Sequence, residues 1–178
     1  MVVVNMAVLP WRHRRLRAEL PARASACAAT VTRYLGEDLP PTTVTLTTRS
    51  GLAWLHVAAN SAGATLRARA WYHWTTYREA RDAAAVTVAA PDGTVRILLD
   101  SAVLATRTDR EVDGYLTHEL VHAVQYARRG QHARLVAGER HNLGLQQLPD
   151  TAVAQGRAAA AAFEAEAYRV QHELVPIP

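Results

Sequence analysis

The chain has 178 residues, of which 49% are hydrophobic and 6% aromatic, and its formal net charge is +4. This length and apolar content predict one domain, residues 1–178, with a single buried core. Its one cysteine, Cys27, excludes an intramolecular disulfide and a cysteine-rich zinc cluster, and no stretch approaches the roughly 18 continuous apolar residues of a membrane span.

The first residues carry no targeting pattern. The apolar stretch from Met1 to Leu9 precedes its arginines, whereas a secretory signal places the positive charge first, so we expect a soluble, cytoplasmic protein. The basic cluster at residues 12–17 is interpreted as a solvated helix face. We therefore expect no specific nucleic-acid partner and no membrane partner.

Residues 1–36 are predicted to be an N-terminal helical segment. Between residues 11 and 36 the apolar positions recur every three or four residues, which is typical of a helix, and Gly36 can end it. The next segment, residues 40–100, is predicted to be mostly β. Val44 to Thr48 favours a strand, and Ala53 to Ala58 and Thr65 to Trp74 are further β-like runs.

The clearest β signal is a hairpin. Val86 to Ala90 and Thr94 to Leu99 flank a Pro-Asp-Gly turn. Thr94 to Leu99 is either a rim that pairs with an extended peptide or an internal strand of the sheet. The preceding aromatic cluster is interpreted as core and groove wall rather than as a base-stacking platform. It comprises Trp54, Trp71, Tyr72, Trp74 and Tyr77.

Two helices are predicted after the hairpin. The first covers residues 109–130, with Asp109 at its start and Gly130 at its end, and the second covers residues 150–175, with Asp150 or Thr151 as its cap. The connection between them has room for a short helix. The elements together predict an α+β fold, in which a small mixed or antiparallel sheet packs on these two helices.

The first of these helices contains the sequence His118-Glu119-Leu120-Val121-His122. Residues four apart share one helix face, so His118 and His122 can direct two imidazole nitrogens at one Zn²⁺ ion. Glu119 can accept the proton of a zinc-bound water and deliver it to a leaving amine. This pattern predicts a zinc-dependent hydrolase.

A catalytic zinc site usually needs a third protein ligand. The short metzincin extension is absent because position 125 is glutamine instead of glycine. The last helix offers two carboxylates, Glu164 and Glu166, which lie about 200° apart around a helix axis and cannot both face one ion. The spacing alone leaves the choice between them open.

The runs YLTHELVHAVQYARRG (residues 115–130) and FEAEAY (residues 163–168) resemble small bacterial gluzincins, including minigluzincins and metallopeptidase-like domains found near contractile injection systems. The resemblance implies a zincin-like fold, one Zn²⁺ ion and Glu164 as its third ligand, with Ala167 permitting close approach of the two helices. Glu166 would then support the site or the fold. Tyr168 stands where larger gluzincins often have an aspartate that orients a zinc histidine, so the Tyr168 hydroxyl or the Gln125 amide could hold an imidazole.

The function expected from these motifs is zinc-dependent peptide hydrolysis, with a peptide or protein as substrate and an endopeptidase as the expected type. His141, Tyr168 and His172 are the candidates for stabilising the oxyanion. The alternative is a zinc-stabilised regulatory or interaction module with little turnover, as in ImmA-type repressor regulators. A third hypothesis, a DNA-associated protease of the SprT type, is favoured only by the N-terminal arginines.

Overall fold

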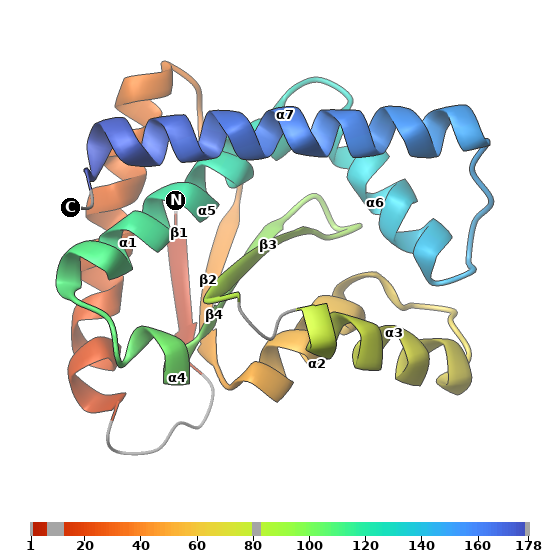
Figure 1. Ribbon diagram of the computed structural model, residues 1–178, viewed down its shortest axis with the longest axis horizontal. Helices are drawn as coiled ribbons and strands as arrows, with labels where there is room; N and C mark the ends of the chain where they lie inside the picture. The colour runs from red at the N-terminus through yellow and green to blue at the C-terminus, as the bar shows by residue number, and fades with distance from the viewer. Residues whose placement is uncertain (1, 7–12, 80–82, 177–178) are drawn as a thin grey trace.

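The computed structural model describes residues 2–6, 13–79 and 83–176, which form an α+β protein (Figure 1). Its strands are β1 (Val2–Met6), β2 (Thr42–Thr47), β3 (Ala85–Ala89) and β4 (Val95–Asp100). Its helices are α1 (Arg14–Leu35), α2 (Arg49–Asn60), α3 (Leu66–Glu79), α4 (Ser101–Leu104), α5 (Asp109–Ala127), α6 (Gln131–Asn142) and α7 (Asp150–Leu174).

The sheet is mixed and has the strand order β1-β2-β4-β3. β1, β2 and β4 run parallel, and β3 pairs antiparallel with β4, which confirms the predicted hairpin. β4 therefore lies inside the sheet, so of the two alternatives for Thr94 to Leu99 the internal strand is confirmed and the rim is wrong. β3 is the edge strand on that side, and the opposite edge is β1. β1 corrects the expectation that residues 1–36 form a helical segment, since the helix α1 begins only at Arg14.

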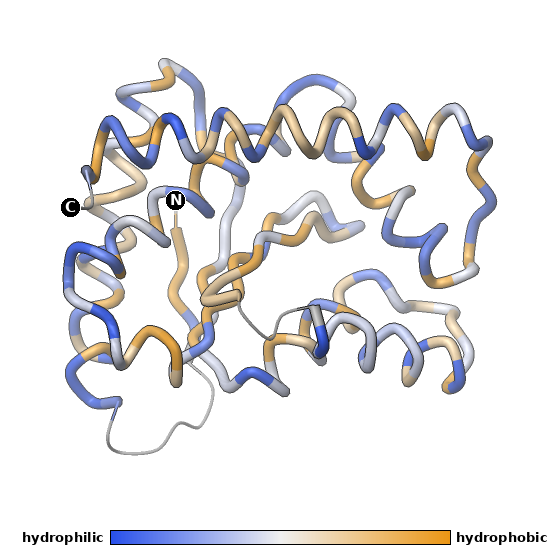
Figure 2. Tube along the Cα trace, viewed as in Figure 1, coloured by the Kyte–Doolittle hydropathy of each residue, from blue (hydrophilic) through white to orange (hydrophobic). Residues whose placement is uncertain are grey.

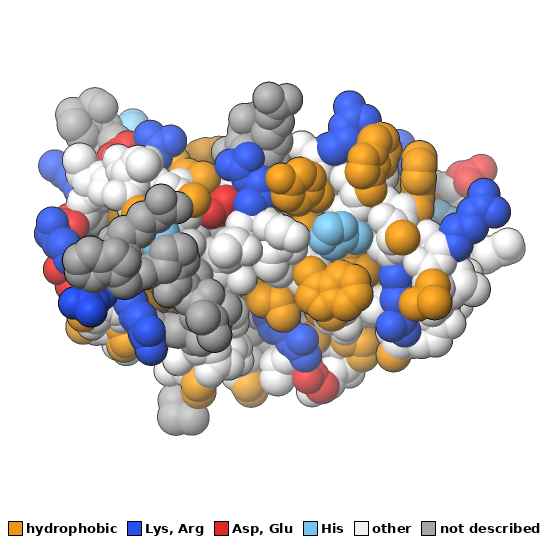
Figure 3. Space-filling view, turned by 90° about the horizontal axis from the view of Figure 1, so that it is seen from below, with side chains coloured by type: hydrophobic (Ala, Val, Ile, Leu, Met, Phe, Trp, Pro, Cys, Tyr) orange, Lys and Arg blue, Asp and Glu red, His pale blue; other side chains and the backbone are white. Residues whose placement is uncertain are grey.

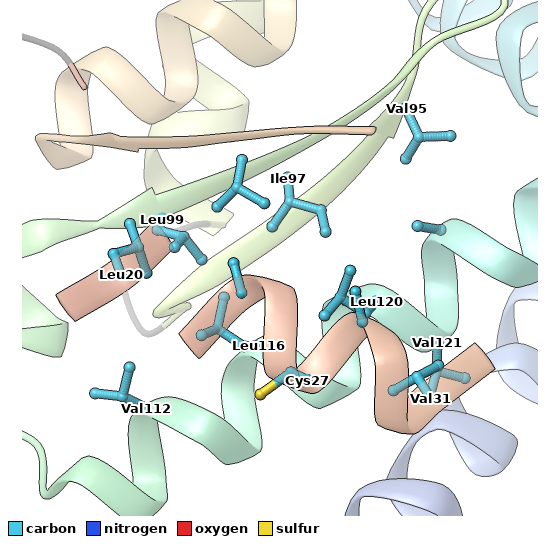
Figure 4. Packing of buried hydrophobic residues seen from close by; sticks show 14 of the residues in the cluster. Leu20, Cys27, Val31, Val95, Ile97, Leu99, Val112, Leu116, Leu120 and Val121 are labelled. Carbon is cyan, nitrogen blue, oxygen red and sulfur yellow. The ribbon is translucent and has the colours of Figure 1, made fainter. Parts of the chain in front are cut away.

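Helices cover both faces of the sheet because successive strand residues point to opposite sides. Ile97 packs into the larger core with α1, α5 and α7, whereas Leu98 packs with Leu52 of α2 on the other face. Figure 4 shows side chains of the larger core that come from β4, α1 and α5. In the hydropathy-coloured trace β1 and β3 are mainly orange, whereas the helices carry both colours (Figure 2).

Residues 49–79 correct the expectation that residues 40–100 are mostly β. The runs Ala53 to Ala58 and Thr65 to Trp74 lie in the helices α2 and α3. The side chain of Thr48 caps α2 by accepting a hydrogen bond from the Gly51 amide at 3.1 Å. Thr65 accepts one from the Ala68 amide at 3.2 Å at the start of α3. These caps satisfy free amides and favour helices here despite the β-branched and aromatic residues.

The aromatic cluster on these two helices is not core. Trp54, Trp71, Trp74 and Tyr77 are all exposed, with relative accessibilities between 42% and 64%. Only Tyr72 of the five is half-buried. α3 packs mainly on α2, so much of its surface faces away from the sheet.

The two predicted helices that carry the motifs are confirmed, with different ends. Thr108, rather than Asp109, caps α5 through a reciprocal pair of hydrogen bonds with Glu111. Pro149 precedes α7, so neither Asp150 nor Thr151 is its cap. α6 fills part of the connection between them, and α7 packs across α5 (Figure 1). Ala167 of α7 is fully buried.

The N-terminal arginines are partly neutralised. Arg15 forms ion pairs with Glu19 and Asp109, at 2.9 and 2.7 Å. Arg12, from the same basic cluster, lies outside the described residues. In the described part of the chain, no helix combines the length and the hydrophobicity needed to cross a membrane.

Candidate metal centre

The candidate site is built on α5, which is buried on almost every side between Leu116 and Gln125 because it packs against α1, α7, β3 and β4. One face of the helix nevertheless opens into a cleft, and this face carries His118, Glu119 and His122. A helix fixed by neighbours on all other sides holds these side chains in defined positions.

His118, His122 and Glu164 lie together at the crossing of α5 and α7. Their potential ligand atoms are all within 4.8 Å of one another, and among the described residues they form a group of the kind that could hold one metal ion. The Nε2 atoms of the two histidines are 3.1 Å apart. The Glu164 oxygens lie 3.4 Å from the first of these atoms and 3.3 Å from the second.

These distances fit a tetrahedral metal ion. Two ligands each about 2.0–2.1 Å from such an ion lie roughly 3.3 Å apart. The two Nε2 atoms are 3.1 Å apart, and each lies 3.3–3.4 Å from a different oxygen of Glu164. Burial and the neighbouring His122 lower the pKa of His118, so its imidazole is held in the neutral, ligand form. The chemistry and spacing of this donor set therefore suit one divalent cation, with two nitrogen ligands and one oxygen ligand.

Two glutamine side chains bind the imidazoles at Nδ1, the ring nitrogen that does not face Glu164. The Oε1 atom of Gln171 lies 3.1 Å from Nδ1 of His118, and Oε1 of Gln125 lies 2.8 Å from Nδ1 of His122. A carbonyl oxygen only accepts hydrogen bonds, so in each ring Nδ1 carries the proton. The Nε2 lone pair of each histidine is consequently free for a metal.

Glu166 acts on this arrangement through Gln125. Its Oε2 atom accepts a hydrogen bond from the Gln125 amide at 3.0 Å, and Arg128 holds the same carboxylate with two hydrogen bonds, at 2.7 and 2.9 Å. Hydrogen bonding to Arg128 lowers the pKa of Glu166. The guanidinium also binds Glu37 at 2.7 Å. Glu166 therefore points away from the cleft, and Glu164 points into it.

Glu119 is positioned by the edge strand. The hydroxyl of Thr87 on β3 donates a hydrogen bond to Oε2 of Glu119 at 2.6 Å, and it also lies 3.1 Å from the Glu119 backbone oxygen. Burial raises the pKa of the Glu119 carboxyl, although the Thr87 hydrogen bond and nearby His122 oppose this. A carboxyl group in such an environment takes up a proton more readily than one in water.

The cleft around these groups has a volume of about 570 Å³. β3 and the residues before it form one wall, from Ala83 to Thr87. The other walls come from α5 and α7, and their lining residues include Tyr115, Tyr126, Tyr168 and Gln171. The Tyr168 ring lies against the His118 ring, with the centroids 4.6 Å apart. The edge strand and the three donor groups thus share one open space.

Two of the three predicted oxyanion candidates lie elsewhere. His141 is in the last turn of α6, where its Nδ1 accepts a hydrogen bond from the Leu148 amide at 3.3 Å. His172 is exposed on α7 and, like His141, is not part of the cleft lining. Tyr168 is the candidate that does line the cleft.

Thr87 and Gln171 were missed by the sequence reasoning. Gln171 did leave a signal, since Glu164, Tyr168 and Gln171 are spaced four and three residues apart and so share one face of a helix. Thr87 left none, because a threonine in a hairpin strand is common and its contact with Glu119 depends on how β3 packs against α5.

Comparisons of the chain with protein-family models, with curated proteins and with solved structures found no significant match.

Proposed function

We propose that this protein is a zinc-dependent peptidase of the gluzincin type, with His118, His122 and Glu164 as the metal ligands. The observation that carries the proposal is the convergence of these three donors at the separations of a tetrahedral site, beside a buried carboxylate. The two motifs that resemble gluzincins supply exactly these groups, so motif and geometry support the same function.

The residues of the cleft have separate roles in this proposal. Zinc, when bound, polarises the scissile carbonyl and lowers the pKa of a water molecule. Glu119 would be the general base toward the attacking water and the general acid toward the leaving amine. Thr87 keeps the carboxylate oriented, and Tyr168 is the candidate donor to the oxyanion.

The edge strand β3 supports a peptide as substrate. One side of β3 pairs with β4, and the other side has no strand partner among the described residues. An extended peptide can add to such an edge through main-chain hydrogen bonds. Since Ala83 to Thr87 form a wall of the cleft, a peptide bound there would pass close to the three donors.

Metal analysis combined with a peptide-cleavage assay tests the proposal. The wild-type protein is expected to hold one zinc ion per chain and to cut a peptide library. Glu119→Gln should keep the ion and reduce turnover by about 10²–10⁴-fold, since it removes the general base. His122→Ala should lose the ion, because it removes a ligand.

Failure of the wild-type protein to bind zinc would overturn the proposal. If zinc is bound at full stoichiometry and the library remains uncut, the regulatory or interaction module replaces the peptidase. The hypothesis of a DNA-associated protease depends on the N-terminal arginines. It loses support because one of them, Arg15, pairs with acidic side chains.

A further inference from the structure

The outer surface of α2 and α3 exposes five large apolar side chains. Their relative accessibilities run from 42% to 84%. We call this surface the α2–α3 aromatic face, and it consists of Trp54, Leu66, Trp71, Trp74 and Tyr77. In the view from below, hydrophobic side chains gather beside arginines around a histidine (Figure 3). Such a concentration of exposed apolar area marks interaction sites more often than chance exposure.

The rings of the α2–α3 aromatic face form two groups of neighbours. The centroids of Trp71 and Trp74 are 5.3 Å apart. His73 links the other two rings, with its centroid 6.0 Å from that of Trp54 and 6.4 Å from that of Tyr77. Because each ring is supported by a neighbour, the face is a preformed surface and not a set of separate, freely rotating side chains.

The face is also positively charged. Arg67 lines an open hollow together with Trp71 and Trp74. The Arg78 guanidinium lies 4.7 Å from the centre of the Trp74 ring. No aspartate or glutamate occurs in α2, and the one acidic residue of α3 is its last residue, Glu79, against the arginines Arg67, Arg69 and Arg78. The complement of this surface is therefore a partner that is both apolar and anionic.

We infer that the α2–α3 aromatic face binds the surface of an anionic lipid membrane. Tryptophan and tyrosine favour the level of the lipid headgroups, where an apolar ring and its polar edge are both satisfied. Arginines beside them are attracted to anionic headgroups, and helices that lie in this interface combine the same residue types. The sequence alone led to the opposite expectation, that of no membrane partner.

Two other occupants fit the face less well. A second copy of the chain would bring two arginine-bearing surfaces together, and these would repel. Single-stranded nucleic acid binds by stacking its bases on free ring faces. Here Arg78 lies over Trp74, and the His73 and Tyr77 rings stack on each other at an interplanar angle of 19°.

The inference does not depend on the proposed peptidase activity. No residue of the α2–α3 aromatic face lines the cleft that contains the three donors. α2 packs on one face of the sheet, and α5 packs on the other. The membrane and a peptide could therefore be bound at the same time.

Co-sedimentation with lipid vesicles tests the inference, using the full chain. Vesicles of phosphatidylcholine containing phosphatidylglycerol should bind the protein at low salt and shift its tryptophan emission to shorter wavelength. Pure phosphatidylcholine vesicles should bind it at least about tenfold more weakly, and added salt should release it, because part of the attraction is electrostatic.

The variants Trp71→Ala/Trp74→Ala and Arg67→Glu/Arg78→Glu should each weaken binding at least about tenfold, by loss of apolar area and of charge respectively. All four side chains are exposed, so both variants should keep the wild-type circular dichroism spectrum. Tyr34→Ala on α1 and Arg110→Glu on α5 are the matched controls, since they change exposed residues elsewhere. Both should bind like the wild type.

Absence of binding to the anionic vesicles at low salt would overturn the inference, as would equal binding by the face variants and the controls. An oligothymidylate bound more tightly than the vesicles, and lost in the same face variants, would assign the face to nucleic acid instead. Dimerisation abolished by Trp71→Ala/Trp74→Ala would assign it to a second copy.

Discussion

The Oε1 atom of Gln125 lies 2.8 Å from Nδ1 of His122, and Gln125 is itself fully buried. Its amide nitrogen is occupied as well, by the Phe163 carbonyl and by Glu166, each at 3.0 Å. A side chain with all of these contacts can adopt only one orientation. It thereby fixes both the direction and the tautomer of the imidazole.

Replacing Gln125 by methionine should weaken zinc binding by about 10–100-fold, because the imidazole of His122 loses its orienting partner. The free energy of unfolding of the metal-free protein should fall by about 1–3 kcal/mol, since buried polar groups are left without partners. Competition with a chelator measures the first effect, and urea denaturation measures the second. Gln146→Met, at an exposed position, is the control. Unchanged zinc affinity in Gln125→Met would contradict the orienting role.

The two glutamates of the last helix should respond differently to neutralisation. Glu164→Gln should lose stoichiometric zinc, because its oxygens lie 3.3–3.4 Å from the two Nε2 atoms and complete the donor set. Glu166→Gln should keep one ion per chain and bind it more weakly, since it acts through Gln125. Equilibrium dialysis followed by metal analysis separates these outcomes. Full zinc occupancy in Glu164→Gln would refute the ligand assignment.

Thr87→Val should alter the pH dependence of hydrolysis. The Thr87 hydrogen bond lowers the pKa of Glu119, against the larger effect of burial, so its loss should raise that pKa further. The acid limb of the pH–rate profile should then move to higher pH, while zinc stays bound. Thr87→Ser restores the hydroxyl and should restore the profile. An unshifted acid limb in Thr87→Val would show that the contact has no effect on the base.

Glu139 on α6 provides a test of stability against pH. Burial raises its pKa, but hydrogen bonds from His56 and Tyr72 outweigh this, so the pKa lies below its usual value. The ionised carboxylate therefore stabilises the fold above the pKa of an unfolded glutamate, roughly 4.3, and this contribution is lost as the pH falls through the folded pKa. Thermal unfolding of Glu139→Gln should show a smaller loss of stability on acidification than the wild type. Asp38→Asn, at an exposed loop position, should behave like the wild type; an equal acid dependence in Glu139→Gln would contradict the account.

The elements with strong local signals were predicted from the sequence, and the others depend on distant contacts. The hairpin and the helices that carry the motifs follow from turn residues and from spacing. β1 gave no such signal because it is held by parallel pairing with β2. In the sequence, the whole of α1 separates these two strands. α2 and α3 were misread because valine, threonine and aromatic residues favour strands, although Thr48 and Thr65 each offered a helix cap.

The same distinction applies to the candidate site. His118, Glu119 and His122 were found because a single helix carries them with a fixed spacing. The choice of Glu164 over Glu166 needed the crossing of α5 and α7, which spacing along the chain does not determine. Thr87 reaches the site only because the sheet edge packs against α5.

Because Glu164 lies on an exposed part of α7, a bound metal ion would restrain the motion of that helix. The Glu164 side chain is 53% accessible, and the described residues of α7 before Ala167 are all at least partly exposed. An ion held by the α5 histidines and Glu164 would cross-link α5 to α7. The segment between these ligands, α6 and the first half of α7, would then be tied down at both ends. Chelation should then increase amide hydrogen exchange in α7 before it affects the sheet.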